Sequence, residues 1–238
     1  LVKVLSDLKN AGHEVILVSS GAIGMGVGKL NLPGKPSDMP TKQAAAAVGQ
    51  CELMYTYDRL FGQYNHTVAQ MLLTWEDFDH ENRLHNLKNT LERLLQLHAI
   101  PIINENDPVA CEEYSLGDND TLAAIVACCC KADLLVLLSD IDGLYTANPH
   151  THPDAALIPL VEEITPEVMA LADGAGSALG TGGMATKLRA ARMVTGSGAD
   201  MVIANGAHPE LLYDIAAGKP IGTRFAGHKQ PALSTQEV

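Results

Sequence analysis

The sequence is poor in aromatic residues and in positive charge, and it contains no long apolar segment. Phe, Trp and Tyr make up 4% of the 238 residues, which disfavours an aromatic-rich β-sandwich. Lys and Arg number 16 against 28 Asp and Glu, so the formal net charge is −12. Such a surface repels nucleic acid and anionic membranes. Because no run of about 18 apolar residues occurs, no membrane-spanning helix is expected. We expect a cytoplasmic protein.

The spacing of cysteine, histidine and serine excludes several classes of enzyme. The five cysteines never occur in C-x-x-C spacing, so we expect Cys128, Cys129 and Cys130 to be reduced and buried in a helix. The nine histidines do not form an H-E-x-x-H motif, and no G-x-S-x-G hydrolase motif is present. No metal site built by the protein itself is therefore predicted.

Short apolar runs alternate with longer segments of helical periodicity. This alternation predicts a three-layer α/β sandwich with a mostly parallel central sheet and helices on both faces. We expect one domain over residues 1–225 and an unstructured tail over 226–238. The predicted strands are 14–18, 66–73, 100–104, 134–138 and 201–204, and the main predicted helices are 41–62 with Thr41 as N-cap, 81–98, 119–131, 166–172, 184–197 and 210–217.

A glycine-rich turn follows the first predicted strand, in the segment SSGAIGMG at residues 19–26. In parallel α/β sheets, ligands bind beyond the carboxyl ends of the strands. Backbone N–H groups of such a turn can hold a carboxylate or a phosphate. The alternative is a tight turn whose glycines allow close packing. The sequence alone leaves the two interpretations open.

Two acidic clusters follow later, at residues 104–107 and 118–120. An Asp or Asn at the start of a helix is a common N-cap, which accounts for one of these residues. It does not account for both clusters. They are suited to binding an ammonium group or to positioning a lysine.

Two further loops favour phosphate or nucleotide binding. The segment GTGGMATK at residues 180–187 places glycine amides and a lysine at the start of a helix. The segment SDIDGLY at residues 139–145 follows the most apolar strand, and it is either a turn or a loop that contacts nucleotide.

Six segments taken together resemble the amino-acid kinase family, and within it the members that phosphorylate glutamate. They are VSSGAIGMG, KQAAAAVGQ, INENDPVA, GDND, LLSDIDGLYTANP and GTGGMATK, and they occur in the family's order from Val15 to about Phe225. The resemblance implies transfer of a phosphoryl group from ATP to the γ-carboxylate of L-glutamate. The product would be L-glutamyl 5-phosphate, in the first step of proline biosynthesis.

The resemblance also implies roles for individual residues. Lys187 and Asp120 would be catalytic, with Asp120 organising the catalytic lysines. Glutamate would be held by Ser20, Gly21, Asp107 and Asn119. ATP, with Mg²⁺ as cofactor, would be held by Ser139, Asp140, Thr181, Gly182, Gly183, Met184, Ala185, Thr186 and Lys187. A homo-oligomer is implied, with proline as a candidate feedback inhibitor.

The sequence as written departs from the family's pattern at its start, because it begins after the strand that carries a lysine and a Gly-Thr/Ser loop. We expect it by itself to bind ligand weakly and to lose about 3 kcal/mol of transition-state stabilisation. We expect a version extended by that strand to be active. If the sequence is one part of a bifunctional enzyme with a reductase half, a mitochondrial location is the alternative to the cytoplasm.

Two other functions remain open at this point. The first is a related kinase that acts on acetylglutamate, aspartate or carbamate, although INENDPVA and LGDND favour glutamate. The second is a non-catalytic chain that binds glutamate or proline and regulates a partner. A nucleic-acid-binding function is disfavoured by the negative charge.

Overall fold

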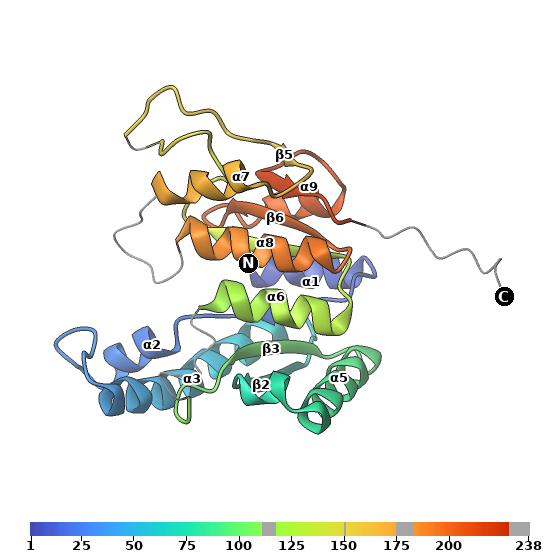
Figure 1. Cartoon of the computed structure of the whole chain (residues 1–238). Helices are drawn as coiled ribbons and strands as arrows, with labels where there is room; N and C mark the ends of the chain where they lie inside the picture. The colour runs from blue at the N-terminus through green and yellow to red at the C-terminus, as the bar shows by residue number, and fades with distance from the viewer. Residues whose placement is uncertain (111–117, 150, 175–182, 229–238) are drawn as a thin grey trace. The chain divides into compact units, whose positions relative to one another are not determined.

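The computed structural model describes residues 1–110, 118–149, 151–174 and 183–228 (Figure 1). The chain divides into two compact units, Leu1–Leu122 and Ala123–Val238. The division falls within helix α6, Asn119–Cys130. No helix in the described part of the chain combines the length and apolar character needed to cross a membrane.

The first unit contains a three-stranded parallel sheet in the order β1-β3-β2, of which β2 and β3 are labelled in Figure 1. The central strand is almost entirely buried, which suits its apolar sequence IPIIN. The strands are β1 Leu17–Val18, β2 Val68–Leu73 and β3 Ile100–Glu105, and the helices are α1 Val2–Asn10, α2 Ala22–Lys29, α3 Met39–Gly62, α4 Glu76–Asp79 and α5 Glu81–Gln96.

The predicted strands 66–73 and 100–104 are confirmed in this unit, as is the helix predicted over 81–98. The strand predicted over 14–18 is shorter, because β1 pairs with β3 only through Leu17 and Val18. The prediction that Thr41 caps α3 is wrong. Asp38 is the N-cap, and its Oδ1 accepts a hydrogen bond of 3.0 Å from the backbone N–H of Thr41. Pro40 in the first turn supports this start, because that position needs no N–H donor.

Helices α2 and α3 lie unusually close together because each has a glycine where they meet. A Cβ added at Gly26 would lie 1.8 Å from the carbonyl oxygen of Ala45. A Cβ added at Gly49 would lie 1.7 Å from the carbonyl oxygen of Ala22. No side chain can occupy either position without moving backbone, so the two glycines fix the place of α2 against α3.

We expect Gly26→Ala to lower the free energy of unfolding by about 3 kcal/mol or more, because the helices must separate. Gly24 is a matched control on the same helix, since a Cβ there meets nothing within 4 Å. Gly24→Ala should raise the free energy of unfolding by about 0.5–1 kcal/mol. Urea unfolding of the three proteins measures both changes. Equal effects of the two substitutions would show that the helices do not touch at Gly26.

The second unit contains a four-stranded mixed sheet in the order β4-β6-β7-β5. The β4–β6 and β5–β7 pairs are parallel, and the β6–β7 pair is antiparallel. The strands are β4 Leu134–Ser139, β5 Leu160–Val161, β6 Asp200–Asn205 and β7 Thr223–Phe225, and the helices after α6 are α7 Pro166–Ala170, α8 Met184–Gly196 and α9 Leu211–Ala216, with a 3-10 helix over Leu171–Gly174.

The predicted strands 134–138 and 201–204 and the helix predicted over 184–197 are confirmed. The helix predicted over 166–172 is shorter and passes into the 3-10 turn. Strands β5 and β7 were not predicted, because two or three residues are too few to show a periodic pattern. Leu188 and Val194 of α8 and Ile203 of β6 are fully buried and belong to the core of this unit.

The expectation that the cysteine run would be buried is wrong. Cys128, Cys129 and Cys130 are free thiols and each is partly exposed. Consecutive helical residues point in directions about 100° apart, so three in a row cannot all face one core. Cys51 is free and exposed.

Candidate active site

The three strands of the first unit are parallel, so their carboxyl ends meet at one edge of the sheet. The backbone N–H of Ser19 donates to the carbonyl of Ile103 at 2.9 Å, and the N–H of Asn106 donates to the carbonyl of Leu73 at 2.7 Å. These bonds hold the loops that follow β1, β2 and β3 side by side. The predicted glutamate-binding residues Ser20, Gly21 and Asp107 therefore come to the same edge.

The glycine-rich turn after β1 has a geometry that is compatible with both interpretations that the sequence left open. Gly21 has φ +104° and is the N-cap of α2, a backbone conformation that favours glycine. Ser20 and Gly21 are exposed, next to the first N–H groups of α2, which lack helical acceptors. The turn can therefore present donors to an anion, while Gly26 provides the close packing.

Asp107 follows β3 and is half-buried. Burial, and secondarily the charge of Glu105, raises the pKa of Asp107 from 3.8 to about 6. Both causes act against the negative charge of the carboxylate. A positive group of a ligand beside Asp107 would stabilise the ionised carboxylate against both effects, so this position favours an ammonium group.

The acidic cluster at the start of α6 separates into a cap and two further residues. Asp118 is the cap, because its Oδ1 accepts from the backbone N–H of Thr121 at 2.7 Å and its Oδ2 from the Thr121 hydroxyl at 3.3 Å. Asn119 and Asp120 are the first two residues of the helix and are half-buried. The capping function that the sequence could assign to any of the three belongs to Asp118.

Two residues that the sequence analysis missed contact this edge of the sheet from α3. The Gln50 Oε1 accepts from the Asn104 Nδ2 at 3.0 Å, and the hydroxyls of Tyr57 and Ser19 lie 2.8 Å apart. A glutamine directly after the apolar run AAAAVG was the available signal, since buried polar residues of a helix need a partner.

The second unit has a comparable edge where β4 and β6 end together, with Ser139 paired to Asn205. The Ser139 hydroxyl donates to the Asp140 carboxylate at 3.1 Å. The N–H of Gly206 donates to the Ser139 carbonyl at 2.7 Å, and the Asn205 side chain donates to the Asp142 carboxylate at 2.8 Å. The predicted nucleotide loop is thus joined to the end of β6.

The same loop is held at its other end by Thr223 of β7. The Thr223 Oγ1 accepts from the N–H of Leu144 at 2.8 Å and donates to the carbonyl of Ile158 at 2.6 Å. A Cβ added at Gly143 would lie 2.5 Å from that Oγ1, so glycine is required for the contact. These contacts fix the loop against β6 and β7.

Lys187 lies in the first turns of α8, which begins after the N-cap Gly183. The residue is 9% exposed, an unusually low value for lysine. The Thr186 hydroxyl donates to the Gly183 carbonyl at 2.7 Å and tightens this helix start. The predicted nucleotide-binding residues Thr181 and Gly182 lie outside the described residues, whereas Gly183, Met184, Ala185, Thr186 and Lys187 lie within them.

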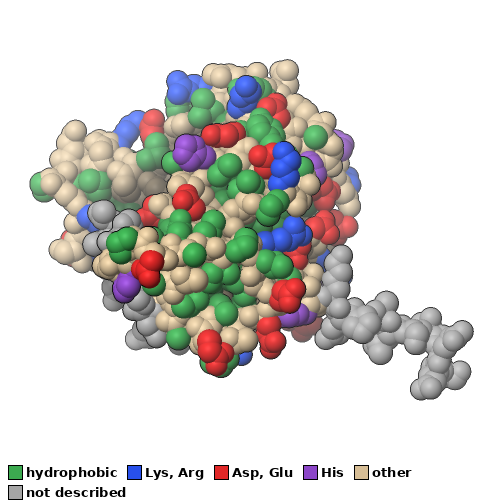
Figure 2. Space-filling model, turned by 90° about the horizontal axis from the view of Figure 1, so that it is seen from above, with side chains coloured by type: hydrophobic (Ala, Val, Ile, Leu, Met, Phe, Trp, Pro, Cys, Tyr) green, Lys and Arg blue, Asp and Glu red, His purple; other side chains and the backbone are tan. Residues whose placement is uncertain are grey.

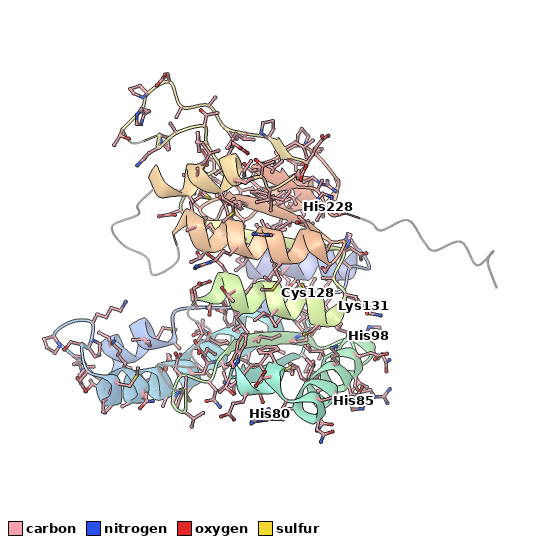
Figure 3. The ribbon with its side chains drawn as sticks, in the orientation of Figure 1. His80, His85, His98, Cys128, Lys131 and His228 are labelled. Atoms are coloured by element: carbon pink, nitrogen blue, oxygen red, sulfur yellow. The ribbon has the colours of Figure 1, made fainter. Side chains whose placement is uncertain are left out.

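Histidines and acidic residues do not gather into a metal centre in residues 1–110, 118–149, 151–174 and 183–228, where no group of three or more His, Cys, Asp or Glu could hold an ion. In Figure 3, His80, His85 and His98 lie at different places before, along and after α5. On the face shown in Figure 2, acidic and basic side chains are interspersed, without one large basic patch. This face therefore offers no extended positive surface to an anion.

Comparison with known proteins decides the family. The sequence profile described as "Amino acid kinase family" matches residues 1–205. The chain belongs to this family. The glutamate 5-kinase of Clostridium tetani is 55% identical over 225 residues, covering 94% of this chain and 84% of that protein. The glutamate 5-kinase of Listeria monocytogenes is 52% identical over 234 residues, covering 97% and 85%. These relatives confirm the resemblance to kinases of glutamate.

Solved structures of low sequence identity confirm the α/β fold. Carbamate kinase from Giardia lamblia bound to AMP-PNP matches with a TM-score of 0.67 at 18% identity, covering 95% of this chain and 88% of that one. The T. acidophilum isopentenyl phosphate kinase product complex matches with a TM-score of 0.62 at 20% identity, covering 94% and 87%. Their different substrate names show that this amino acid kinase fold does not by itself fix the substrate.

Proposed function

We propose that the protein transfers a phosphoryl group from ATP to the γ-carboxylate of L-glutamate. The product is L-glutamyl 5-phosphate, and the reaction is the first step of proline biosynthesis. The observation that carries this conclusion is the 55% identity to a glutamate 5-kinase over 94% of the chain. Two groups of polar residues, one on each unit, supply the chemistry that the reaction needs.

Glutamate binds to the first unit. Asp107 meets the ammonium group, because burial and the charge of Glu105 both favour a cation beside it. Ser20 and Gly21 hold a carboxylate through the hydroxyl and the backbone donors of the turn before α2. Asn119, the first residue of α6, contributes its amide, while Asp118 caps that helix.

ATP binds to the second unit. Ser139 and Asp140 lie in the loop after β4, where parallel strands commonly present ligand-binding groups. The start of α8 offers N–H groups and the positive end of the helix dipole to the phosphates. The nucleotide-binding segment runs over 181–187 and includes Thr181 and Gly182.

The reaction requires positioning and charge compensation more than covalent help from the protein. Lys187 supplies positive charge to the oxygens of the transferring phosphoryl group. Asp120 organises the catalytic lysines. Mg²⁺ would neutralise phosphate charge and would enter the site together with ATP. Residues 118–149 and 183–228 hold no group of three ligands for an ion. Mg²⁺ bound to ATP needs at most one or two protein carboxylates.

Three finer proposals rest on the family resemblance. The protein assembles as a homo-oligomer. Proline, the end product of the pathway that this reaction begins, inhibits it. The enzyme acts in the cytoplasm, where its substrates glutamate and ATP are available.

Release of ADP with a panel of acids tests the proposed substrate. We expect glutamate to give kcat/KM about 100-fold higher than aspartate, which is one methylene shorter, and higher than N-acetylglutamate, whose amide cannot pair with Asp107 as an ammonium can. A higher value with acetylglutamate, aspartate or carbamate would identify a related kinase instead. Glutamate binding without ADP release from any acid would favour the regulatory alternative.

A further inference from the structure

Helix α3 contacts the two segments that lead into the proposed glutamate site, namely strand β3 and the turn between β1 and α2. Gly49 lies against Ala22, the first residue of α2 after the turn at Gly21. The next residue of α3, Gln50, bonds to Asn104 of β3. Tyr57, about two turns further along α3, contacts Ser19 after β1.

The bond between Gln50 and Asn104 has a direction that the neighbouring backbone determines. The backbone N–H of Glu105 can only donate, and it lies 2.9 Å from the Asn104 Oδ1. The Asn104 Nδ2 must therefore face Gln50, and Gln50 must present its Oε1 as acceptor. Gln50 thus fixes the Asn104 side chain, which in turn fixes the backbone leading to Asp107.

This arrangement leaves the other half of the Gln50 amide without a partner. Gln50 is 7% exposed and Asn104 is 4% exposed, so the pair is buried. The buried Gln50 Nε2 has no hydrogen-bond partner in the described part of the structure. A buried unpaired donor is destabilising, and such a residue is more readily explained by function than by stability.

Tyr57 acts in the same way on the turn after β1. The Ser19 Oγ donates to the Ser20 carbonyl at 3.2 Å. A hydroxyl has a single proton, so in the 2.8 Å contact with Ser19 the Tyr57 hydroxyl is the donor. The bonds run from Tyr57 to Ser19 to the backbone of Ser20. The Tyr57 ring packs against the buried Phe61, with centroids 6.3 Å apart.

We propose that Gln50 and Tyr57 are positioning residues for glutamate: from one helix they hold the ends of β3 and β1, so that Asp107 and Ser20 bind opposite ends of the same substrate. Neither residue touches substrate in this proposal. It rests on the proposed function, and it adds that affinity for glutamate is set by the face of α3 that contacts the sheet.

Steady-state kinetics of Gln50→Met and Tyr57→Phe test the inference. Each should raise the KM for glutamate about tenfold and leave the KM for ATP within about twofold, because each shifts a glutamate-binding group without altering the second unit. The thermal midpoint should change little in Gln50→Met. The parent has an unpaired buried N–H donor at Gln50, and the variant has one at Asn104 instead.

Matched controls are available in the same unit. Tyr55 is an exposed tyrosine of α3, and Gln70 is an exposed glutamine of β2. Tyr55→Phe and Gln70→Met should leave both KM values unchanged. The double variant Gln50→Met, Asn104→Ala should have a glutamate KM no higher than Asn104→Ala alone, because Gln50 acts through Asn104.

Two outcomes would overturn the inference while leaving the proposed function intact. One is an unchanged glutamate KM in both variants of a parent that turns over glutamate. The other is a parallel rise of both KM values together with a lower thermal midpoint, which indicates a structural role only. A parent that does not turn over glutamate at all contradicts the proposed function instead.

Discussion

Replacing Lys187 with alanine should lower kcat about 10²- to 10³-fold, with a smaller effect on the KM for glutamate. Removing one preorganised group that stabilises developing charge typically has an effect of this size. The structure favours a well-defined position for this ammonium group, because Lys187 is only 9% exposed and lies in the first turns of α8. Its buried stem also allows little freedom to the ammonium group.

Two further variants separate catalysis from folding. Lys187→Met keeps most of the buried stem, so it should show the same loss of kcat with a thermal midpoint near that of the parent. Arg189→Ala removes an exposed cation of the same helix and should leave kcat unchanged. Comparable losses in the Arg189 variant, or full activity of Lys187→Met, would contradict the assignment of Lys187.

Replacing Asp107 with asparagine should raise the KM for glutamate about 100-fold, because the ammonium group loses a partly buried carboxylate partner. The KM for ATP should stay within about twofold. Asp79→Asn, an exposed substitution in α4, is the control and should change neither value. A similar rise of the KM for both substrates would show that Asp107 is required for folding rather than for binding.

The pKa of about 6 gives Asp107 a recognisable pH dependence. Only the ionised carboxylate pairs with an ammonium, so the KM for glutamate should rise up to tenfold for each pH unit below about 6. In Asp107→Asn this dependence should be absent. A parent whose glutamate KM is constant between pH 5 and 7 would contradict the pairing.

The raised pKa of Asp107 also predicts that its ionised carboxylate destabilises the folded protein at neutral pH. The folded pKa lies above the ordinary value of 3.8, so the favourable contribution of Asp107 is present below pH 3.8 and is lost as the pH rises through about 6. At neutral pH the ionised group is therefore destabilising. Asp107→Asn should be more stable than the parent at pH 7 by about 1 kcal/mol, allowing for solvent screening. Higher stability of Asp107→Asn together with weaker glutamate binding would show that Asp107 serves binding rather than folding.

The strands and helices with strong patterns could be predicted from the sequence. Strand β3, with its apolar IPIIN run, and the helix α8 start both lie where periodicity placed them. The glycine-rich turn after β1 and the loop after β4 were also recognised, since polar residues directly after apolar strands are informative in a parallel sheet. These segments hold most of the proposed site.

What the sequence could not show depends on contacts between distant residues. Gln50 and Asn104, or Tyr57 and Ser19, have no sequence pattern that announces their pairing. The cap of α3 was misassigned because Asp38 and Thr41 are both good N-cap residues, and only the direction of the hydrogen bond distinguishes them. Strands β5 and β7 form through pairing with neighbours rather than through their own few residues.

Trapping of the product with hydroxylamine is the most direct measurement of the central claim. The full-length protein is incubated with ATP, Mg²⁺, L-glutamate and hydroxylamine, and the hydroxamate is identified by mass spectrometry against authentic α- and γ-glutamyl hydroxamates. We predict the γ-glutamyl hydroxamate, formed only with ATP and glutamate together and nearly lost in Lys187→Ala. Formation of the α-isomer, or absence of any hydroxamate from folded protein that binds both substrates, would contradict phosphorylation of the γ-carboxylate.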